Sequence, residues 1–176
     1  MKNTMLRKEK RKTDKKIEKN LKKKNEGFKK VIPTSLKSAE NKLWAVFSVY
    51  IRLRDSNSQG IGSCFTCGKL LHWTKGDCGH GIPRQHKATK FNEWNNHLQC
   101  KRCNGFEGGA RELYKQNMNK KYGPETWEKM LIASKQTVKW SVVGLTEHLE
   151  IYKSKINYLR SDTAKVWRVS LPISFI

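Results

Sequence analysis

Acidic residues and long apolar runs are what this sequence has least of. Its 15 Asp and Glu stand against 37 Lys and Arg, a formal net charge of +22. Such an excess predicts a polyanionic partner, nucleic acid above all. No apolar stretch approaches the 18 residues that a membrane-spanning helix needs, and no hydrophobic core follows the basic start as in a signal peptide. We therefore expect no membrane partner and a location in a reducing cytoplasm.

The positive charge is unevenly distributed along the chain. Residues 1–30 hold 14 of the Lys and Arg and four of the acidic residues, with few apolar side chains. Such a segment cannot bury a core, so we expect residues 1–32 to be a disordered basic arm that binds phosphates without reading sequence; the alternative is a solvating tail. Residues 33–160 would form the folded domain and residues 161–176 a C-terminal tail.

Apolar side chains recur at three- and four-residue spacing in four segments, which predicts four helices. The first begins after a cap at Thr34 or Ser35 and ends near Arg54. Irregular short strands and loops are expected over 61–106. Three more helices are expected over 107–121, over 124–135, and from 141 or 144 to 159. The fold class is therefore predicted as α+β.

Cysteine is also scarce, but four of the five cysteines form two Cys-x-x-Cys pairs. Cys64 and Cys67 make the first pair, and Cys100 and Cys103 make the second. Four thiolates in this spacing supply the closed tetrahedral ligand set of a structural Zn²⁺ site. The alternatives are two unrelated thiol pairs or a redox motif. Cys78 has no partner and is expected to be a small buried residue.

Between and behind these pairs, His80, Asn95 and Asn104 follow the order found in HNH-type nucleases. That resemblance implies that His80 deprotonates a water, Asn95 orients His80, and Asn104 binds a divalent cation. A neutral imidazole accepts a proton near pH 7 without large tuning, and oxygen ligands suit Mg²⁺ or Mn²⁺. The structural alternatives are a histidine packed beside the zinc, a turn asparagine and a helix-capping asparagine.

A more specific resemblance rests on the segments around the cysteines. Residues 64–68, 79–84 and 95–104 resemble the NinG family of lambdoid phages, the Rap recombination endonucleases, and the likeness extends over about residues 35–160. It implies an HNH-like ββα-metal core stapled by the four-cysteine zinc site and covered by flanking α-helices. It also implies a structure-selective DNA endonuclease that cuts branched double-stranded DNA, such as Holliday junctions and D-loops. Phage recombination proteins would be its partners and the host cytoplasm its location.

The sequence departs from the HNH pattern at Asn104, which stands in place of a final histidine, and directly before His80. Many HNH enzymes carry an acidic metal ligand directly before the catalytic histidine, where this chain has Gly79. Asp77 is the candidate second ligand, and Glu107, His86 and a bound water are rivals. The cations Arg84, Lys101, Arg102 and Arg111 are candidate phosphate contacts, although each could simply be solvated. The aromatic residues Trp73, Phe91 and Trp94 could stack on exposed bases or pack around the zinc.

Two other functions stay open on sequence grounds. One is a non-catalytic zinc module that binds nucleic acid through the basic arm and the cysteine pairs. The other is a recombination accessory protein that acts through its C-terminal helices. A homodimer is also expected if a four-way junction is cut symmetrically, because a C₂ dimer supplies two active sites.

Overall fold

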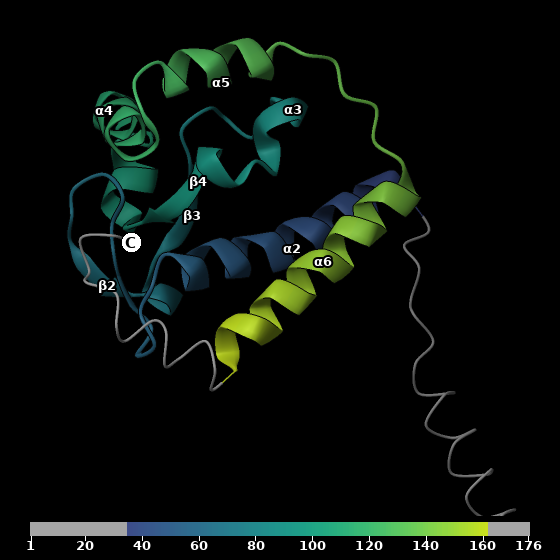
Figure 1. Ribbon diagram of the computed structural model, residues 1–176, viewed down its shortest axis with the longest axis horizontal. Helices are drawn as coiled ribbons and strands as arrows, with labels where there is room; N and C mark the ends of the chain where they lie inside the picture. The colour runs from purple at the N-terminus through teal and green to yellow at the C-terminus, as the bar shows by residue number, and fades with distance from the viewer. Residues whose placement is uncertain (1–34, 162–176) are drawn as a thin grey trace, which may run out of the picture. The chain divides into compact units, whose positions relative to one another are not determined.

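The computed structural model describes residues 35–161, which form an α+β unit of helices and two small sheets (Figure 1). The basic arm and all but the first residue of the expected C-terminal tail lie outside the described residues. The longer helices are α2 (Leu36–Arg54), α4 (Arg111–Tyr122), α5 (Thr126–Ser134) and α6 (Val142–Arg160). The strands are β1 (Ile61–Ser63), β2 (Leu70–His72), β3 (Asp77–His80) and β4 (Asn96–Gln99). Short helical segments are η1 (Trp73–Lys75), α3 (Lys87–Lys90), η2 (Glu93–Asn95) and the π-helical η3 (Arg102–Phe106). No helix in this part of the chain is long and apolar enough to cross a membrane.

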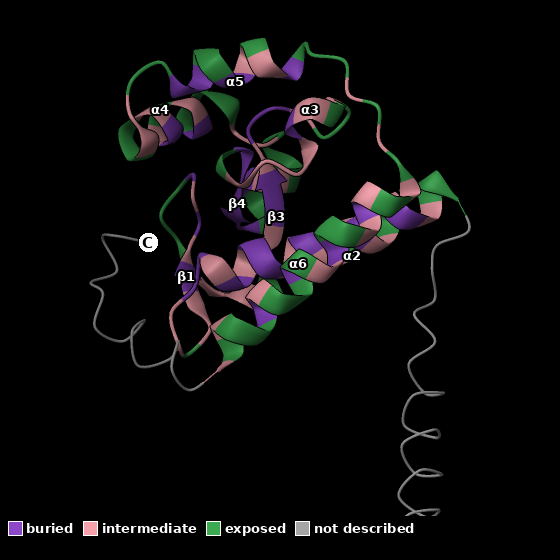
Figure 2. Ribbon diagram, turned by 45° about the vertical axis from the view of Figure 1, so that its right-hand side comes forward, coloured by how far each residue is buried: buried purple, intermediate pink, exposed green. Residues whose placement is uncertain are grey.

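Helices α2 and α6 lie side by side, with their buried faces turned toward each other (Figure 2). The Ser35 side chain caps α2 by accepting a hydrogen bond from the Ser38 N–H, as the sequence predicted. The Ser141 hydroxyl caps α6 in the same way, accepting from the Gly144 N–H. The core between the two helices is built from the apolar positions that the periodicity indicated: Ala39, Leu43, Phe47 and Ile51 of α2 with Leu145, Leu149, Tyr152 and Ile156 of α6.

Helix α4 begins four residues later than the pattern predicted. The chain enters it through Gly108 and Gly109, with φ of 57° and 91°, and then Ala110 with φ of 47°. This left-handed backbone is incompatible with a right-handed helix, so the helix cannot start at Glu107. Helix α5 likewise begins at Thr126, after Glu125 with φ of 65°. The predicted stop at Gly123 is confirmed, with φ of 104°.

The four strands form two separate antiparallel hairpins rather than one sheet. In the first, Ser63 pairs with Leu70, so the β1–β2 turn carries the first cysteine pair. In the second, Asp77 pairs with Gln99 and His80 pairs with Asn96. A long loop over residues 81–95 joins β3 to β4, and α2 packs against both of these strands. A second core cluster of Ile82, Tyr114, Met118, Trp127 and Met130 joins this loop to α4 and α5.

Candidate functional site

The four paired cysteines meet in one cluster, with all their sulfur atoms within 4.8 Å of one another. Cys64 and Cys67 come from the β1–β2 turn, and Cys100 and Cys103 come from the end of β4 and from η3. The Sγ atoms of Cys67 and Cys100 are 3.8 Å apart. A tetrahedral zinc with Zn–S bonds of about 2.3 Å holds its sulfurs about 3.8 Å apart, whereas a disulfide requires about 2.05 Å. The cluster therefore fits a structural Zn²⁺ ion.

The surroundings favour the thiolate, the form that binds metal, at Cys100, whereas burial raises the pKa of the Cys64 and Cys103 thiols. The Cys100 N–H donates a hydrogen bond to Cys64 Sγ at 3.3 Å. Burial raises the pKa of the Cys100 thiol, but hydrogen bonds from the Cys103 backbone and the neighbouring thiols outweigh it and bring that pKa to about 7. Behind the first pair, Gly68 adopts φ of 74°, the left-handed turn expected there.

His80 ends β3, and its ring stacks on Trp44 of α2 with ring centroids 4.9 Å apart. Burial, together with the charges of Arg84 and Lys90, lowers the pKa of His80 to about 4, so the imidazole is neutral at pH 7. Its Nε2 atom is buried and has no hydrogen-bond partner. A hydrogen bond to the Lys90 backbone engages the ring on its other side.

Asn95 is fully buried and its side chain braces the loop that follows His80. Its Oδ1 accepts from the Ile82 N–H at 2.7 Å, and its Nδ2 donates to the carbonyls of Ile82 and Thr89 at 2.9 and 3.1 Å. We expected Asn95 to hold the His80 ring directly. The structure instead uses its amide to fix the loop backbone, because the loop has polar groups buried far from water that need partners.

Asn104 and Asp77 lie together beside the cysteine cluster. Asn104, which directly follows Cys103 in η3, donates from Nδ2 to Asp77 Oδ2 at 3.2 Å. The Lys101 Nζ lies 3.8 Å from the other oxygen of Asp77. Of the two rivals for the second metal-ligand position, Glu107 is paired with Arg102 at 2.7 Å, and His86 precedes α3 in the 81–95 loop.

Strand geometry separates this pair from His80. Asp77 and His80 stand three residues apart on β3, so their side chains point to opposite faces of the hairpin, roughly 10 Å apart along the strand. Cys78, on the same face as His80, packs in the α2–α6 core. The three predicted catalytic residues thus occupy separate places around the β3–β4 hairpin.

Gly79 is a glycine because the hairpin leaves no room for a side chain there. A Cβ atom at this position would lie 1.7 Å from Gln99 Oε1. Gln99 is fully buried and cannot swing away easily, since its Nε2 donates to Thr66 Oγ1 and to the Gly109 carbonyl. The acidic ligand found at this position in many HNH enzymes therefore does not fit this chain.

Replacing Gly79 by alanine is accordingly expected to destabilise the protein by about 1–3 kcal/mol through overpacking. Urea unfolding of Gly79→Ala would measure this cost. Gly105→Ala is the matched control, because a Cβ there meets nothing within 4 Å. Equal stability of the two variants would contradict the close packing of Gly79 on Gln99.

The four predicted phosphate contacts are all exposed to solvent. Arg84 and Arg111 are exposed, as are Lys101 and Arg102, whose side chains are 72% and 81% exposed. Lys101 and Arg102 line a cleft of about 630 Å³ beside Cys67 and Cys100. Lys69 and Lys75 line it too, and sequence reasoning missed both because they reach the cleft only through the fold of the β1–β2 turn and of η1.

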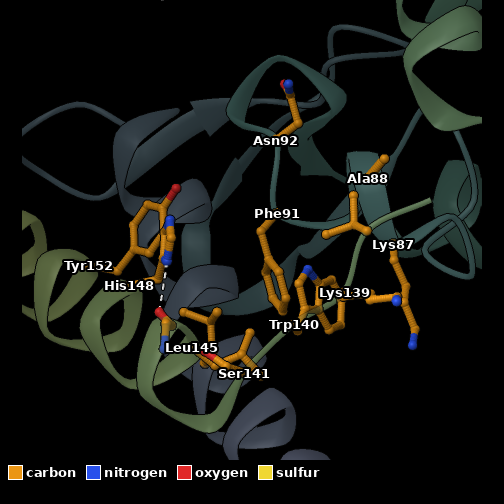
Figure 3. Close-up of a pocket in the computed structure, with 13 residues that line it drawn as sticks. Lys87, Ala88, Phe91, Asn92, Lys139, Trp140, Ser141, Leu145, His148 and Tyr152 are labelled. Atoms are coloured by element: carbon orange, nitrogen blue, oxygen red, sulfur yellow. Dashed lines mark hydrogen bonds between the residues drawn. The ribbon is translucent and has the colours of Figure 1, made fainter. Parts of the chain in front are cut away.

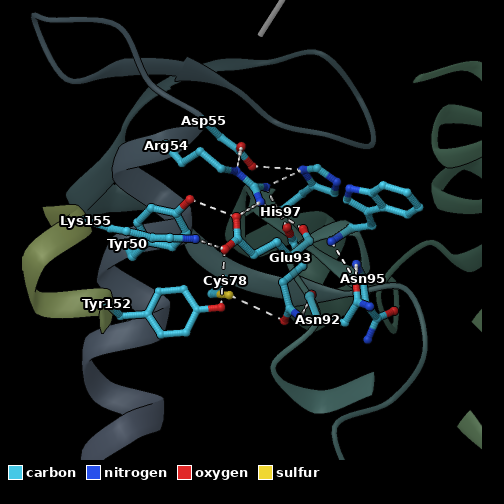
Figure 4. Close-up of polar contacts among 12 residues, drawn as sticks. Tyr50, Arg54, Asp55, Cys78, Asn92, Glu93, Asn95, His97, Tyr152 and Lys155 are labelled. Carbon is cyan, nitrogen blue, oxygen red and sulfur yellow. Dashed lines mark hydrogen bonds and ion pairs between the residues drawn. The ribbon is translucent and has the colours of Figure 1, made fainter. Parts of the chain in front are cut away.

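A buried polar network that the sequence did not reveal lies where α2 meets β4 (Figure 4). Arg54, at the end of α2, donates to Asp55 Oδ1 at 2.8 Å and to the carbonyls of Glu93 and Asn96. Asp55 Oδ2 lies 3.0 Å from His97 Nδ1. Although burial opposes it, Arg54 and His97 hold the pKa of Asp55 well below its usual range. His97 is thus a core residue.

A second cleft of about 450 Å³ lies between α3 and the start of α6 (Figure 3). Its lining includes Lys87, Phe91, Trp140 and His148. None of the predicted catalytic or zinc-binding residues lines it. Phe91 is packed among the aromatic rings of this region, so of the three aromatic candidates it takes the packing role.

Comparison with known proteins supports the sequence resemblance. A family model described as Bacteriophage Lambda NinG protein matches residues 1–162. No curated protein and no solved structure matches the chain. The match covers the cysteine cluster, the β3–β4 hairpin and every described helix. The chain therefore belongs to the bacteriophage lambda NinG family.

Proposed function

We propose that this protein is a metal-dependent endonuclease that cuts branched double-stranded DNA, such as Holliday junctions and D-loops, during phage homologous recombination. The observation that carries the proposal is the contact between Asp77 and Asn104 directly behind the cysteine cluster. Two oxygen-bearing side chains from distant parts of the chain meet there, and the zinc staple fixes their distance. Membership of the NinG family supports the branched substrate.

Asp77 and Asn104 suit a hard divalent cation rather than zinc. Asn104 faces Asp77 through its Nδ2, which leaves its Oδ1 available as a neutral ligand. Mg²⁺ and Mn²⁺ prefer such oxygens and keep several waters, so one carboxylate and one amide suffice. A bound cation would supply the positive charge that phosphodiester hydrolysis requires at the phosphate. The order of β3, β4 and η3 agrees with the hairpin-then-helix order of an HNH-like ββα-metal core.

The remaining roles fall to His80 and to the exposed cations. In this proposal His80 takes a proton from the attacking water at Nε2, which has no partner. That atom is buried against Trp44, and His80 points to the opposite face of the β3–β4 hairpin from Asp77 and Asn104. This role therefore requires DNA binding to release the ring from Trp44 and to rearrange the end of β3 toward the cation site. Arg84, Lys101, Arg102 and Arg111 would contact phosphates, together with Lys69 and Lys75 of the cleft beside the zinc.

A second function is favoured by the same burial of His80. If the imidazole stays stacked on Trp44, it is a structural residue, and the protein is a non-catalytic zinc-dependent nucleic-acid-binding or recombination accessory protein. This alternative needs the zinc and the charge but neither His80 nor Asn104.

Cleavage of a labelled synthetic four-way junction, beside a linear duplex of the same sequence, tests these proposals. With Mg²⁺ or Mn²⁺ we expect the wild type to cut only the junction. His80→Ala should lower the rate about 100-fold or more, the usual range for loss of a general base. Asn104→Ala should also lower the rate strongly, because it removes a ligand of the proposed cation. His148→Ala, which changes an exposed histidine on α6, is the matched control. Zinc content and junction affinity should be the same in all four proteins.

Each other outcome decides between the alternatives. Cutting of both the junction and the linear duplex would support a nuclease but contradict its selectivity for branched DNA. Tight junction binding without cutting by any protein would establish the binding module instead. Loss of activity in Asn104→Ala but not in His80→Ala would support the cation site and show that another residue is the general base.

The proposal includes a homodimer on the junction and phage recombination proteins as partners in the host cytoplasm. Two incisions across a four-way junction need two active sites, which a C₂ dimer supplies. A solution mass that stays monomeric with and without junction DNA would remove the dimer.

A further inference from the structure

Four aromatic rings form a continuous stack that runs from the first cysteine pair to the surface. Phe65, which lies between the first two cysteines, stacks on His97 with centroids 3.8 Å apart and an interplanar angle of 10°. His97 stacks on Tyr122 at 5.7 Å and 27°, and Tyr122 stacks on Trp94 at 5.3 Å and 19°. The small angles mean that the four rings are nearly parallel.

The inner rings of this stack are held rigidly. The Tyr122 hydroxyl lies 3.1 Å from His97 Nε2, and His97 Nδ1 lies 3.0 Å from Asp55 Oδ2. His97 is fully buried. At the outer end, the Asn92 side chain accepts a hydrogen bond from the Trp94 N–H at 2.8 Å, which fixes the backbone of the last ring.

The outer ring is open to solvent. Trp94 is 54% exposed although its ring stacks on Tyr122. A flat, rigid, exposed indole at the end of a parallel stack is the arrangement onto which a further planar ring adds at little entropic cost. Positive charge runs beside the stack, since the Lys121 Nζ lies 5.6 Å from the Tyr122 ring centre and 5.9 Å from that of Phe65.

We propose that Trp94 is a stacking platform for an unpaired DNA base. Every nucleobase offers a π-face, but bases inside an intact duplex are covered on both sides by their neighbours. The platform therefore distinguishes DNA with unpaired or unstacked bases from continuous duplex. This inference rests on the proposed function in assuming a DNA substrate, and it names a residue that selects branched over linear DNA without taking part in cleavage.

Binding to a duplex with one central unpaired 2-aminopurine, compared with the same duplex fully paired, tests the platform. Fluorescence anisotropy is measured on zinc-loaded protein without added Mg²⁺ or Mn²⁺, so that no cleavage contributes. Trp94→Ala should weaken binding to the bulged duplex about tenfold, the lower part of the range for losing one base–aromatic stack, and leave the paired duplex within about twofold. Wild type should quench the 2-aminopurine emission and Trp94→Ala should not.

Two further variants secure the interpretation. Trp94→Phe keeps a ring on Tyr122 and should retain most of the affinity and quenching, which excludes a folding defect as the cause. Tyr158→Ala removes another exposed aromatic side chain, which lies on α6 and is 59% exposed. This variant should bind both duplexes as tightly as the wild type.

If Trp94→Ala weakens binding to both duplexes equally, or does not weaken binding to the bulged duplex, the proposed platform is wrong. A Trp94-dependent preference for single-stranded RNA over the bulged DNA would also overturn it. If the wild type cuts the junction but Trp94→Ala binds the bulged duplex as tightly as the wild type does, only this inference is rejected. Trp94-dependent binding without any cleavage would reject the endonuclease and leave the platform standing.

Discussion

Cys103→Ser is expected to release the zinc and to unfold the region around the β3–β4 hairpin. The cysteine cluster joins the β1–β2 turn to the end of β4, and among residues 35–161 the partly buried apolar side chains packed against it are Leu71 and Ala110. Structural zinc sites contribute on the order of 10–16 kcal/mol of apparent binding free energy near pH 7, which is folding free energy when the unfolded chain has no site. A serine hydroxyl does not replace a thiolate in a closed tetrahedral site.

Zinc stoichiometry by atomic emission and thermal unfolding by circular dichroism check this result. We expect one zinc per wild-type chain, and in Cys103→Ser loss of most of that zinc together with a large fall in Tm. Cys78→Ala is the matched control: Cys78 is buried between strand and helix and donates only to Asn96 Oδ1, outside the cluster. It should keep its zinc and lose little stability. One zinc per chain with an unchanged Tm in Cys103→Ser would refute the site.

The second large effect is a loss of stability as pH falls from about 6.5 to 4. The pKa of His97 is lowered to about 4, mainly by burial, and partly restored by Asp55. The ordinary histidine pKa is about 6.5, so between these values the unfolded chain binds a proton that the folded chain does not, and stability declines. The pKa of His80 is lowered to about 4 in the same direction. Each histidine contributes a loss of about 3 kcal/mol across this window.

Urea unfolding at intervals from pH 7.5 to 4.5 measures the decline. Acid also protonates the cysteine thiolates and releases zinc, so the zinc content is recorded at each pH. The deciding comparison is between the pH dependence of stability in the wild type and in His97→Gln. The variant should be less stable at pH 7, since it disturbs the contacts to Asp55 and Tyr122, but its stability should fall less steeply with acid. Parallel slopes for the two proteins would show that His97 does not titrate in this window.

Local features of the sequence determined much of the fold. The apolar spacing located α2 and α6, and the cap predicted at Thr34 or Ser35 placed the start of α2, because a helix is specified by its own periodicity and its first turn. The spacing of the two Cys-x-x-Cys pairs predicted the four-cysteine cluster, because zinc geometry restricts which spacings can close. The predicted start of α4 was wrong by four residues, because the Gly108–Gly109 pair forms a left-handed turn that Ala110 continues before the helix begins.

The arrangement of the candidate site was decided only by the tertiary structure. Sequence order placed His80, Asn95 and Asn104 in an HNH-like series, but strand alternation turns His80 toward Trp44 while Asp77 meets Asn104 on the other side. The polar network of Arg54, Asp55 and His97 and the ring stack ending at Trp94 were equally hidden. Each depends on contacts between residues distant in the chain, and such contacts are set by how helices and hairpins pack rather than by any local pattern.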